Sequence, residues 1–204
     1  MKRTCWIISG GEFDRTVPHS YDYVIACDKG YAHAEKLGVV PDLVIGDFDS
    51  YGGDVPEGMN VIALPTAKDD TDTGYAVNHA ISLGYDEIII SCALGGRPDH
   101  MYSNIQSLCH AANAGAATRI ISGNAIIHAV CGEPLIIEKR PGWEFSVFAF
   151  SDRCTGVNIT GAGYPLSDVE LINTFPIGQS NFWAYDEVTV SCKTGTLLVM
   201  EVSL

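Results

Sequence analysis

Two aspartates separated by one residue follow a short apolar run early in the sequence. Gly46-Asp47-Phe48-Asp49-Ser50 comes directly after Leu43-Val44-Ile45, a pattern typical of a buried strand that ends in a loop. Like charges about 4 Å apart repel by about 4 kcal/mol at the effective dielectric of a protein surface, so a fold that gathers them normally supplies a cation. Mg²⁺ is the natural candidate, because it usually takes one or two carboxylates together with water and substrate phosphates.

Two further acidic clusters lie between strand-like and helix-like segments. They are Asp69-Asp70-Thr71-Asp72 and Gly95-Gly96-Arg97-Pro98-Asp99-His100. Paired glycines let the backbone approach a ligand, and the planar guanidinium of Arg97 can hold a phosphate. The helix expected to follow would add partial positive charge at its start. We therefore expect three loops to meet at one edge of a sheet and to hold a metal-bound nucleotide.

The elements expected in residues 1–123 alternate between strands and helices. The strands are predicted at Thr4–Ser9, Tyr23–Cys27, Leu43–Ile45, Val61–Leu64, Ile88–Ser91 and Ala117–Ile121, and the helices at Tyr31–Leu37, Thr73–Leu83 and about Met101 to Ala114. This alternation predicts an α/β domain with a parallel sheet that helices cover on both faces, with ligands at the carboxyl ends of the strands. Asp28 is a further carboxylate at a strand end, unless it serves only as a helix N-cap.

Residues 124–204 contain short alternating or apolar runs separated by Gly, Pro and Asn. Strands are predicted at Ile126–Val130, Leu135–Ile137, Glu144–Phe150, Gly156–Thr160, Val188–Cys192 and Thr196–Val202. This pattern indicates a C-terminal all-β domain, a small sandwich or barrel, of which we expect the sandwich. The stretches Gly163–Leu166 and Gly178–Trp183 are either ordinary turns with aromatic rings over the core or a surface that stacks on a flat cationic ring.

Composition excludes several classes of protein. The chain of 204 residues carries a net charge of −13, which disfavours binding to nucleic acid. Its apolar runs are too short for a membrane helix, and the first one lacks the length of a signal peptide, so we expect a cytoplasmic protein. The seven cysteines form no CxxC pair, and we expect buried, reduced thiols.

Four motifs in this order and spacing resemble those of the thiamine pyrophosphokinase family. They are Asp28-x-Gly30, Pro41 to Ser50, Lys68 to Asp72, and Gly95 to His100. The resemblance implies transfer of a diphosphoryl group from Mg-ATP to the hydroxyl of thiamine, with release of AMP. It also implies an ATP- and Mg-binding catalytic domain over 1–123, a thiamine-binding and dimerisation β-sandwich over 124–204, and a homodimer with active sites between subunits.

The same resemblance implies roles for individual residues. Metal and phosphate carboxylates would be Asp47, Asp49 and Asp72, with Asp28 and Asp99 completing an acidic ring. Residues facing ATP would be Lys68, Gly95, Gly96, Arg97 and His100, and residues holding thiamine would be Ser180 and Asn181. Lys29 departs from the glycine that many members have there, and it adds a cation that can reach phosphate. Either Asp72 or Asp99 would orient or deprotonate the thiamine hydroxyl.

Two other functions remain open from the residues alone. A metal-dependent phosphohydrolase could use Asp47 and Asp49 as a nucleophile pair after a strand. A non-catalytic regulator could bind nucleotide or thiamine without turnover. A transferase releases AMP, a hydrolase releases free phosphate, and a regulator binds without releasing AMP.

Overall fold

The computed structural model describes residues 2–46, 58–65 and 70–204. The expectations for Asp47, Asp49 and Lys68 therefore lie outside the described residues. The chain divides into two compact units, Met1–Gly123 and Asn124–Leu204.

The first unit is a parallel sheet with helices, as the alternation of elements predicts. Its elements are β1 (Thr4–Ile8), β2 (Tyr23–Cys27), α1 (Gly30–Leu37), β3 (Leu43–Gly46), β4 (Val61–Ala63), α2 (Asp72–Ser82), β5 (Glu87–Ser91), α3 (Pro98–Asn113) and β6 (Ala117–Ile121). The strands lie in the order β4-β3-β2-β1-β5-β6, and every pair of neighbours is parallel. In the central strand, Ile7 is level with Ile25 of β2 and with Ile90 of β5.

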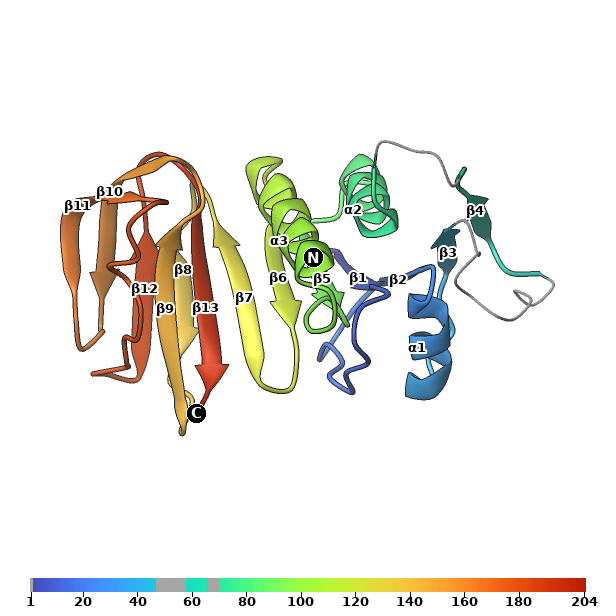
Figure 1. Ribbon diagram of the computed structural model, residues 1–204, viewed down its shortest axis with the longest axis horizontal. Helices are drawn as coiled ribbons and strands as arrows, with labels where there is room; N and C mark the ends of the chain where they lie inside the picture. Colours follow the sequence, from blue (N-terminus) through green and yellow to red (C-terminus); the bar gives the residue numbers. More distant parts are fainter. Residues whose placement is uncertain (1, 47–57, 66–69) are drawn as a thin grey trace. The chain divides into compact units, whose positions relative to one another are not determined.

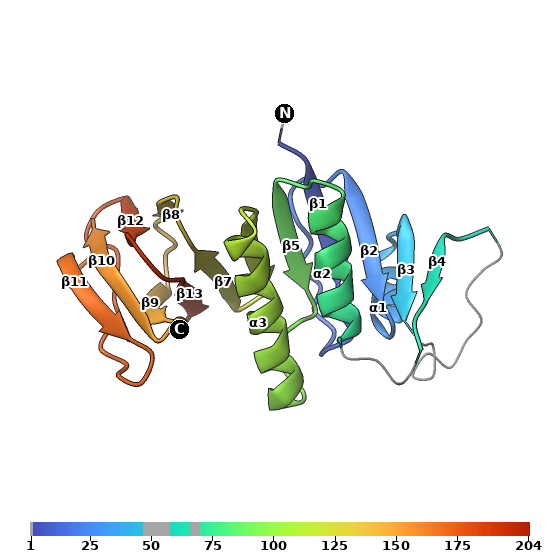
Figure 2. The same cartoon turned by 90° about the horizontal axis from the view of Figure 1, so that it is seen from above.

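The helices cover both faces of this sheet. Strands β1, β2 and β5 are almost entirely buried, which is why they appear in the sequence as apolar runs rather than alternating ones. Tyr31 and Ala34 of α1 pack on one face, against a cluster that includes Trp6 and Val24. Helices α2 and α3 lie side by side over the opposite face, as Figures 1 and 2 show.

The second unit is a β-sandwich. Its strands are β7 (Ala125–Val130), β8 (Leu135–Glu138), β9 (Trp143–Ala149), β10 (Arg153–Thr160), β11 (Leu166–Ile172), β12 (Glu187–Ser191) and β13 (Leu197–Ser203). Strand β13 pairs antiparallel with β7 and β9, and a separate antiparallel sheet has the order β11-β10-β12-β8. Side chains from both sheets, such as Val147 and Val199 on one and Val157 and Val188 on the other, form a single core. Figure 1 shows these strands in yellow to red.

Three sequence expectations differ from the structure. Strand β11 was not predicted, because it is an edge strand in which only Leu171 is buried. Helix α3 begins at Pro98 rather than near Met101, because proline is well suited to the first helical position. The cysteines are all free thiols, but Cys131 is exposed whereas the other six are buried. None of the helices in the described part of the chain is long and apolar enough to cross a membrane.

Candidate active site

The order of the strands places a crevice beyond the carboxyl ends of β1 and β5. From β1 the chain continues to β2 on one side, whereas from β5 it continues to β6 on the other side. In parallel sheets, ligands bind at such a reversal of strand order, where the loops that leave two neighbouring strands diverge. The physical expectation from the topology is therefore a binding pocket beside the residues that follow Ile8 and Ser91.

A pocket of about 330 Å³ lies at this position. Its lining comes from the ends of β1 and β2 and from the first two turns of α2 and α3. The lining residues are Ser9, Gly10, Gly11, Cys27, Asp28, Lys29, Thr71, Asp72, Thr73, His100, Ser103 and Asn104. Among the residues predicted from the sequence, the structure brings Asp28, Asp72 and His100 together here.

The turn after β1 forms one wall and is tightly packed. The Gly11 N–H donates to the carbonyl of Cys92 at 2.9 Å, and a Cβ on Gly11 would lie 2.5 Å from that oxygen. A Cβ on Gly30 would lie 2.1 Å from the carbonyl oxygen of Ile8. Side chains at these glycines would push the turn away from β5 and from the start of α1, so the pocket wall depends on both residues being glycine.

Asp28 is positioned by the end of the neighbouring strand. Its backbone has φ of 46°, in the left-handed region that a non-glycine residue seldom adopts. Its N–H donates to the carbonyl of Ile45 at 2.8 Å, and a Cβ on Gly46 would lie 3.1 Å from the Cα of Asp28. This close approach places Asp28 beside the last residue of β3, and Gly46 directly precedes Asp47 in the sequence.

The start of α2 brings a second carboxylate to the pocket. The hydroxyl of Thr71 accepts a hydrogen bond from the N–H of Gly74 at 3.0 Å, so Thr71 caps the helix and Asp72 is its first residue. The hydroxyl groups of Thr73 and Ser9 lie 2.8 Å apart, which joins α2 to the turn after β1. The cap explains why the Asp69–Asp72 cluster lies at a helix start, but it leaves the carboxylate of Asp72 on the pocket wall.

Residues of α3 form the opposite wall. The amide of Asn104, which is buried, donates to the carbonyl of Ala93 at 2.9 Å and so fixes the loop after β5 to the helix. Ser103 directly precedes Asn104 and His100 lies about one turn earlier, and both residues belong to the same lining. Sequence reasoning did not identify Asn104, Ser103, Thr73 or Ser9, because their roles depend on strand order and not on a local motif.

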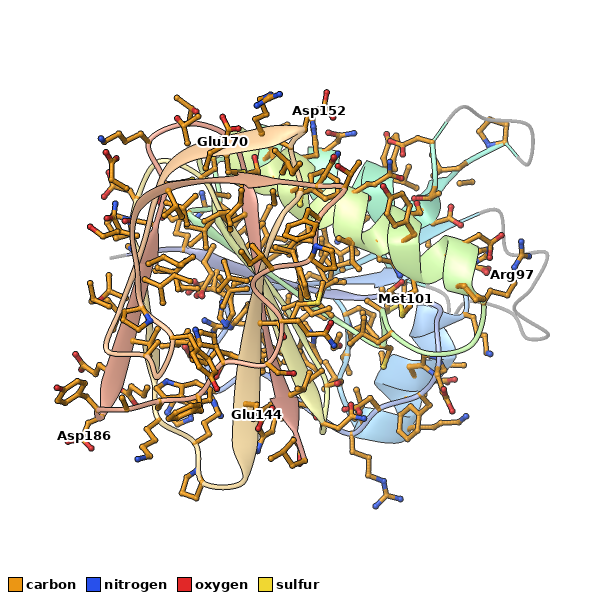
Figure 3. All side chains as sticks on the ribbon, turned by 60° about the vertical axis from the view of Figure 1, so that its left-hand side comes forward. Arg97, Met101, Glu144, Asp152, Glu170 and Asp186 are labelled. Atoms are coloured by element: carbon orange, nitrogen blue, oxygen red, sulfur yellow. The ribbon has the colours of Figure 1, made fainter. Side chains whose placement is uncertain are left out.

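Arg97 and Asp99 form an ion pair with each other and are not among the residues that line the pocket. Gly95 and Gly96 before them both have positive φ, of 78° and 68°, as expected for a glycine turn. A Cβ on Gly95 would lie 2.2 Å from a carboxylate oxygen of Glu12. Figure 3 shows Arg97 at the beginning of α3. The Gly95–His100 loop thus contributes its last residue, His100, to the pocket wall.

Ser180 and Asn181 lie in the second unit. Ser180 is exposed and has φ of 57°, and its N–H donates to the hydroxyl of Ser146 at 3.0 Å. Asn181 is buried, and its carboxamide donates to the carbonyl of Tyr164 and accepts from the N–H groups of Tyr164 and Phe182. The Asn181 side chain therefore holds the loop that precedes β11, whereas the Ser180 hydroxyl lies at the surface.

The donor set of the pocket fits a hard divalent cation together with a phosphate ligand. Asp28 and Asp72 supply carboxylate oxygens, and Lys29 supplies a positive charge. Mg²⁺ commonly uses one or two carboxylates and takes its other ligands from water and phosphate. Within the described residues no group of three or more His, Cys, Asp or Glu side chains could hold a metal.

Comparisons with known proteins agree in sequence and in structure. A family model described as "Thiamin pyrophosphokinase, catalytic domain" matches residues 15–120. The chain is 27% identical to the "Thiamine pyrophosphokinase" of Bacillus subtilis over 210 residues, which cover 97% of this chain and 98% of the relative. A crystal structure of thiamine pyrophosphokinase from Bacillus subtilis superposes with a TM-score of 0.87 at 26% identity, covering 99% of this chain and 100% of that one. The enzyme from Candida albicans shares the fold, with a TM-score of 0.77 at 15% identity over 99% of this chain and 90% of that one.

Proposed function

The chain belongs to the thiamin pyrophosphokinase family, and from this premise we propose that the pocket beside β1 and β5 binds Mg-ATP for transfer of its diphosphoryl group to thiamine. The reaction moves the terminal two phosphates of ATP to the thiamine hydroxyl and releases AMP. The observation that carries the proposal is the meeting of Asp28, Lys29 and Asp72 on one pocket at the reversal of strand order. Phosphoryl transfer needs chiefly positioning and charge stabilisation, and this lining supplies both.

We assign Asp28 and Asp72, with Asp47 and Asp49, which follow β3 in the sequence, as the residues that would hold Mg²⁺. When bound, the cation would neutralise negative charge on the phosphate oxygens. The residues of the chain do the remaining work. The first turn of α2 would direct N–H groups and partial positive charge toward an anion in the pocket. Lys29 and Lys68 add full positive charges, and the small residues Gly10 and Gly11 allow the phosphates to approach the backbone closely.

The base that orients the thiamine hydroxyl is Asp72 in this proposal rather than Asp99. The hydrogen bond from Arg97 lowers the pKa of Asp99 to about 2, with a further contribution from the N–H of His100. Asp72 lines the pocket, whereas Asp99 does not. Asp72→Asn should therefore slow the chemical step in rapid-quench experiments more than Asp99→Asn does.

We propose that the exposed Ser180 hydroxyl and the neighbouring Asn181 segment hold thiamine, and that they act on the partner subunit in a homodimer. Subunit mixing tests this arrangement. Asp72→Asn protein is mixed with Ser180→Ala protein, and part of the activity in the mixture returns to the wild-type KM for thiamine only if one site takes residues from two subunits. We also place the enzyme in the cytoplasm, where ATP and Mg²⁺ are available and free thiols stay reduced.

The deciding experiment measures AMP and thiamine diphosphate from ATP, thiamine and Mg²⁺. Wild type is compared with Asp47→Asn and Asp72→Asn, and Glu133→Gln, an exposed residue of the second unit, is the matched loss of one negative charge. We expect wild type to release AMP only when thiamine is present, and chelation of Mg²⁺ to abolish this release. Both Asp variants should lose the activity, and Glu133→Gln should keep it. Free phosphate without thiamine would establish a phosphohydrolase instead, and nucleotide binding without AMP release would establish a binding protein.

A further inference from the structure

His33 on α1 contacts the turn that forms one wall of the pocket. The side chain is only 2% exposed, and its Nε2 lies 3.0 Å from the carbonyl oxygen of Gly11. A carbonyl oxygen can only accept, so Nε2 carries the hydrogen and donates it. The histidine does not itself line the pocket, but Gly10 and Gly11 do.

The Gly11 peptide is therefore held from two directions. Its N–H donates to the carbonyl of Cys92 at the end of β5, and its carbonyl accepts from His33 of α1. The missing Cβ of Gly11 allows the first contact, because a methyl group there would lie 2.5 Å from the Cys92 oxygen. A glycine without these two bonds would sample many backbone conformations, since it lacks the restriction that a side chain imposes. The bond from His33 fixes the wall on the α1 side.

The surroundings of His33 keep the ring in the form that makes this bond. The other ring nitrogen, Nδ1, is buried and has no hydrogen-bond partner in the part of the chain that the structure describes. The ring packs against Phe13 with centroids 5.4 Å apart. Burial lowers the pKa of His33, the Gly11 carbonyl opposes that shift, and the positive charges of Lys29 and Lys36 lower the pKa further. A protonated ring would bury both a charge and an unpaired donor, so the neutral Nε2–H tautomer is favoured.

We propose that His33 is a positioning residue for the diphosphate-transfer site, where its Nε2–H holds the Ser9–Gly11 turn in the conformation that receives the phosphates of ATP. The inference rests on the proposed function of the pocket. His33 lies outside the acidic motifs, and in this role its ring shapes the binding site in addition to packing against Phe13. Thiamine affinity should not depend on this bond, because the turn is part of the nucleotide pocket.

Two substitutions separate the hydrogen bond from the packing. His33→Phe keeps an aromatic ring against Phe13 but has no donor, whereas His33→Gln carries an amide N–H at a similar reach. Ile120→Val, a fully buried change in β6 of the same unit, controls for a general loss of stability. Affinity for a non-hydrolysable ATP analogue with Mg²⁺ is measured by calorimetry, and KM and kcat for ATP and thiamine are measured at a temperature where unfolding curves show all variants folded.

We expect His33→Phe to bind the analogue about 3- to 10-fold more weakly, the factor that corresponds to one hydrogen bond. KM for ATP should rise with it, KM for thiamine should stay unchanged, and His33→Gln should recover most of the affinity. Wild-type affinity in His33→Phe, or losses in Ile120→Val as large as those in His33→Phe, would overturn the positioning role. If wild type itself shows no thiamine-dependent AMP release, the proposed function fails, and the analogue titration still decides the role of His33.

A measurement on the unmodified protein covers the case in which His33→Phe does not fold. In protein labelled with ¹⁵N at histidine, the NMR shifts of the two ring nitrogens report the tautomer directly. We expect Nε2 of His33 to be protonated and Nδ1 bare at neutral pH, and both shifts to move when the Mg-ATP analogue binds. A doubly protonated or Nδ1–H ring, or shifts that ignore the nucleotide, would contradict the proposal.

Discussion

Arg97 and Asp99 pair with each other at two points, with Nη2 to Oδ2 at 2.6 Å and Nε to Oδ1 at 3.1 Å. Both side chains are more than 60% exposed, and both lie beside the wall that His100 contributes to the pocket. Arg97 presents its planar guanidinium to a carboxylate, and a phosphate group offers the same two-oxygen geometry. Binding of a nucleotide by Arg97 would thus exchange one anionic partner for another, rather than require an unpaired cation.

The first prediction concerns this exchange. Arg97→Met should raise KM for ATP by about tenfold or more through loss of a charge-assisted contact, while the melting temperature stays close to that of wild type. Asp99→Asn should leave Arg97 free for phosphate and should keep most of the ATP affinity. Steady-state kinetics with ATP as the varied substrate and thermal unfolding of the same samples check both statements. A large loss of stability in Arg97→Met would show that the pair is structural instead.

The same ion pair has a defined pH dependence. The hydrogen bond from Arg97 holds the pKa of Asp99 at about 2, below the usual value for an aspartate. The folded pKa is depressed, so the contribution of the pair is present above the unfolded pKa of about 3.8 and is lost as the pH falls toward 2. The difference in unfolding free energy between wild type and Asp99→Asn should accordingly be constant from pH 5 to 9. Urea unfolding across this range tests the prediction, and a slope within it would contradict the assignment.

The second prediction concerns Lys29, which lines the pocket next to Asp28. Lys29→Met should raise KM for ATP by about tenfold, because it removes a cation that can contact phosphate. Lys36→Met is the matched control. It removes the same charge from the last turn of α1, where Lys36 lies 5.3 Å from the centre of the Phe13 ring and does not line the pocket. If both variants change KM equally, the effect comes from net charge and not from a phosphate contact.

The third prediction uses the buried imidazole of His33. Its pKa in the folded protein lies below the usual histidine value of about 6.5, mainly because burial disfavours the charged ring. Between the pKa of His33 in the folded protein and its pKa in the unfolded chain, the unfolded chain binds more protons than the folded one. The contribution of neutral His33 to the unfolding free energy is therefore fully present above pH 6.5 and is lost as the pH falls through the folded pKa. Wild type should lose unfolding free energy between pH 7.5 and pH 5.5, and His33→Gln should lose less. Parallel urea titrations at the two pH values measure the difference.

The elements that sequence reasoning located well are those whose pattern reflects their own burial. Strands β1, β2 and β5 are surrounded by other elements and therefore consist of continuous apolar residues. The edge strand β11 is mostly solvated, so its polar residues resemble a loop. An edge strand is specified by its pairing with β10, and that pairing involves residues distant in sequence.

In the site, too, residues marked by a local sequence motif could be predicted, whereas residues that depend on contacts distant in sequence could not. Asp28 and Asp72 could be assigned to a strand end and a helix start, and those positions meet in the structure. Ser9 and Asn104 could not be assigned, because they face the pocket only when β1 and β5 are neighbours in the sheet. The pairing of Arg97 with Asp99 depends on side-chain directions in the first turn of α3, which began three residues before its predicted start.

The final prediction distinguishes the roles of Ser180 and Asn181. The Asn181 carboxamide makes three hydrogen bonds to the backbone, one from its Nδ2 at 2.9 Å and two to its Oδ1 at 3.0 and 2.9 Å. Asn181→Ala would leave backbone groups of Tyr164 and Phe182 without these partners, and we expect a loss of roughly 2–3 kcal/mol in unfolding free energy. Ser180→Ala changes only an exposed hydroxyl, because alanine meets the same positive φ of 57° with the same strain. It should leave stability unchanged.

Kinetics on the same two variants then test the thiamine contact itself. If the Ser180 hydroxyl holds thiamine, Ser180→Ala raises KM for thiamine about fivefold and leaves KM for ATP unchanged, as expected for one hydrogen bond. Asn181→Ala should affect thiamine through the position of the whole Tyr164 loop, so its kinetic defect should grow with temperature as the loop loosens. A stable Asn181→Ala protein with a thiamine defect independent of temperature would instead make Asn181 a direct ligand, whose carboxamide exchanges its bonds to Tyr164 for bonds to the substrate.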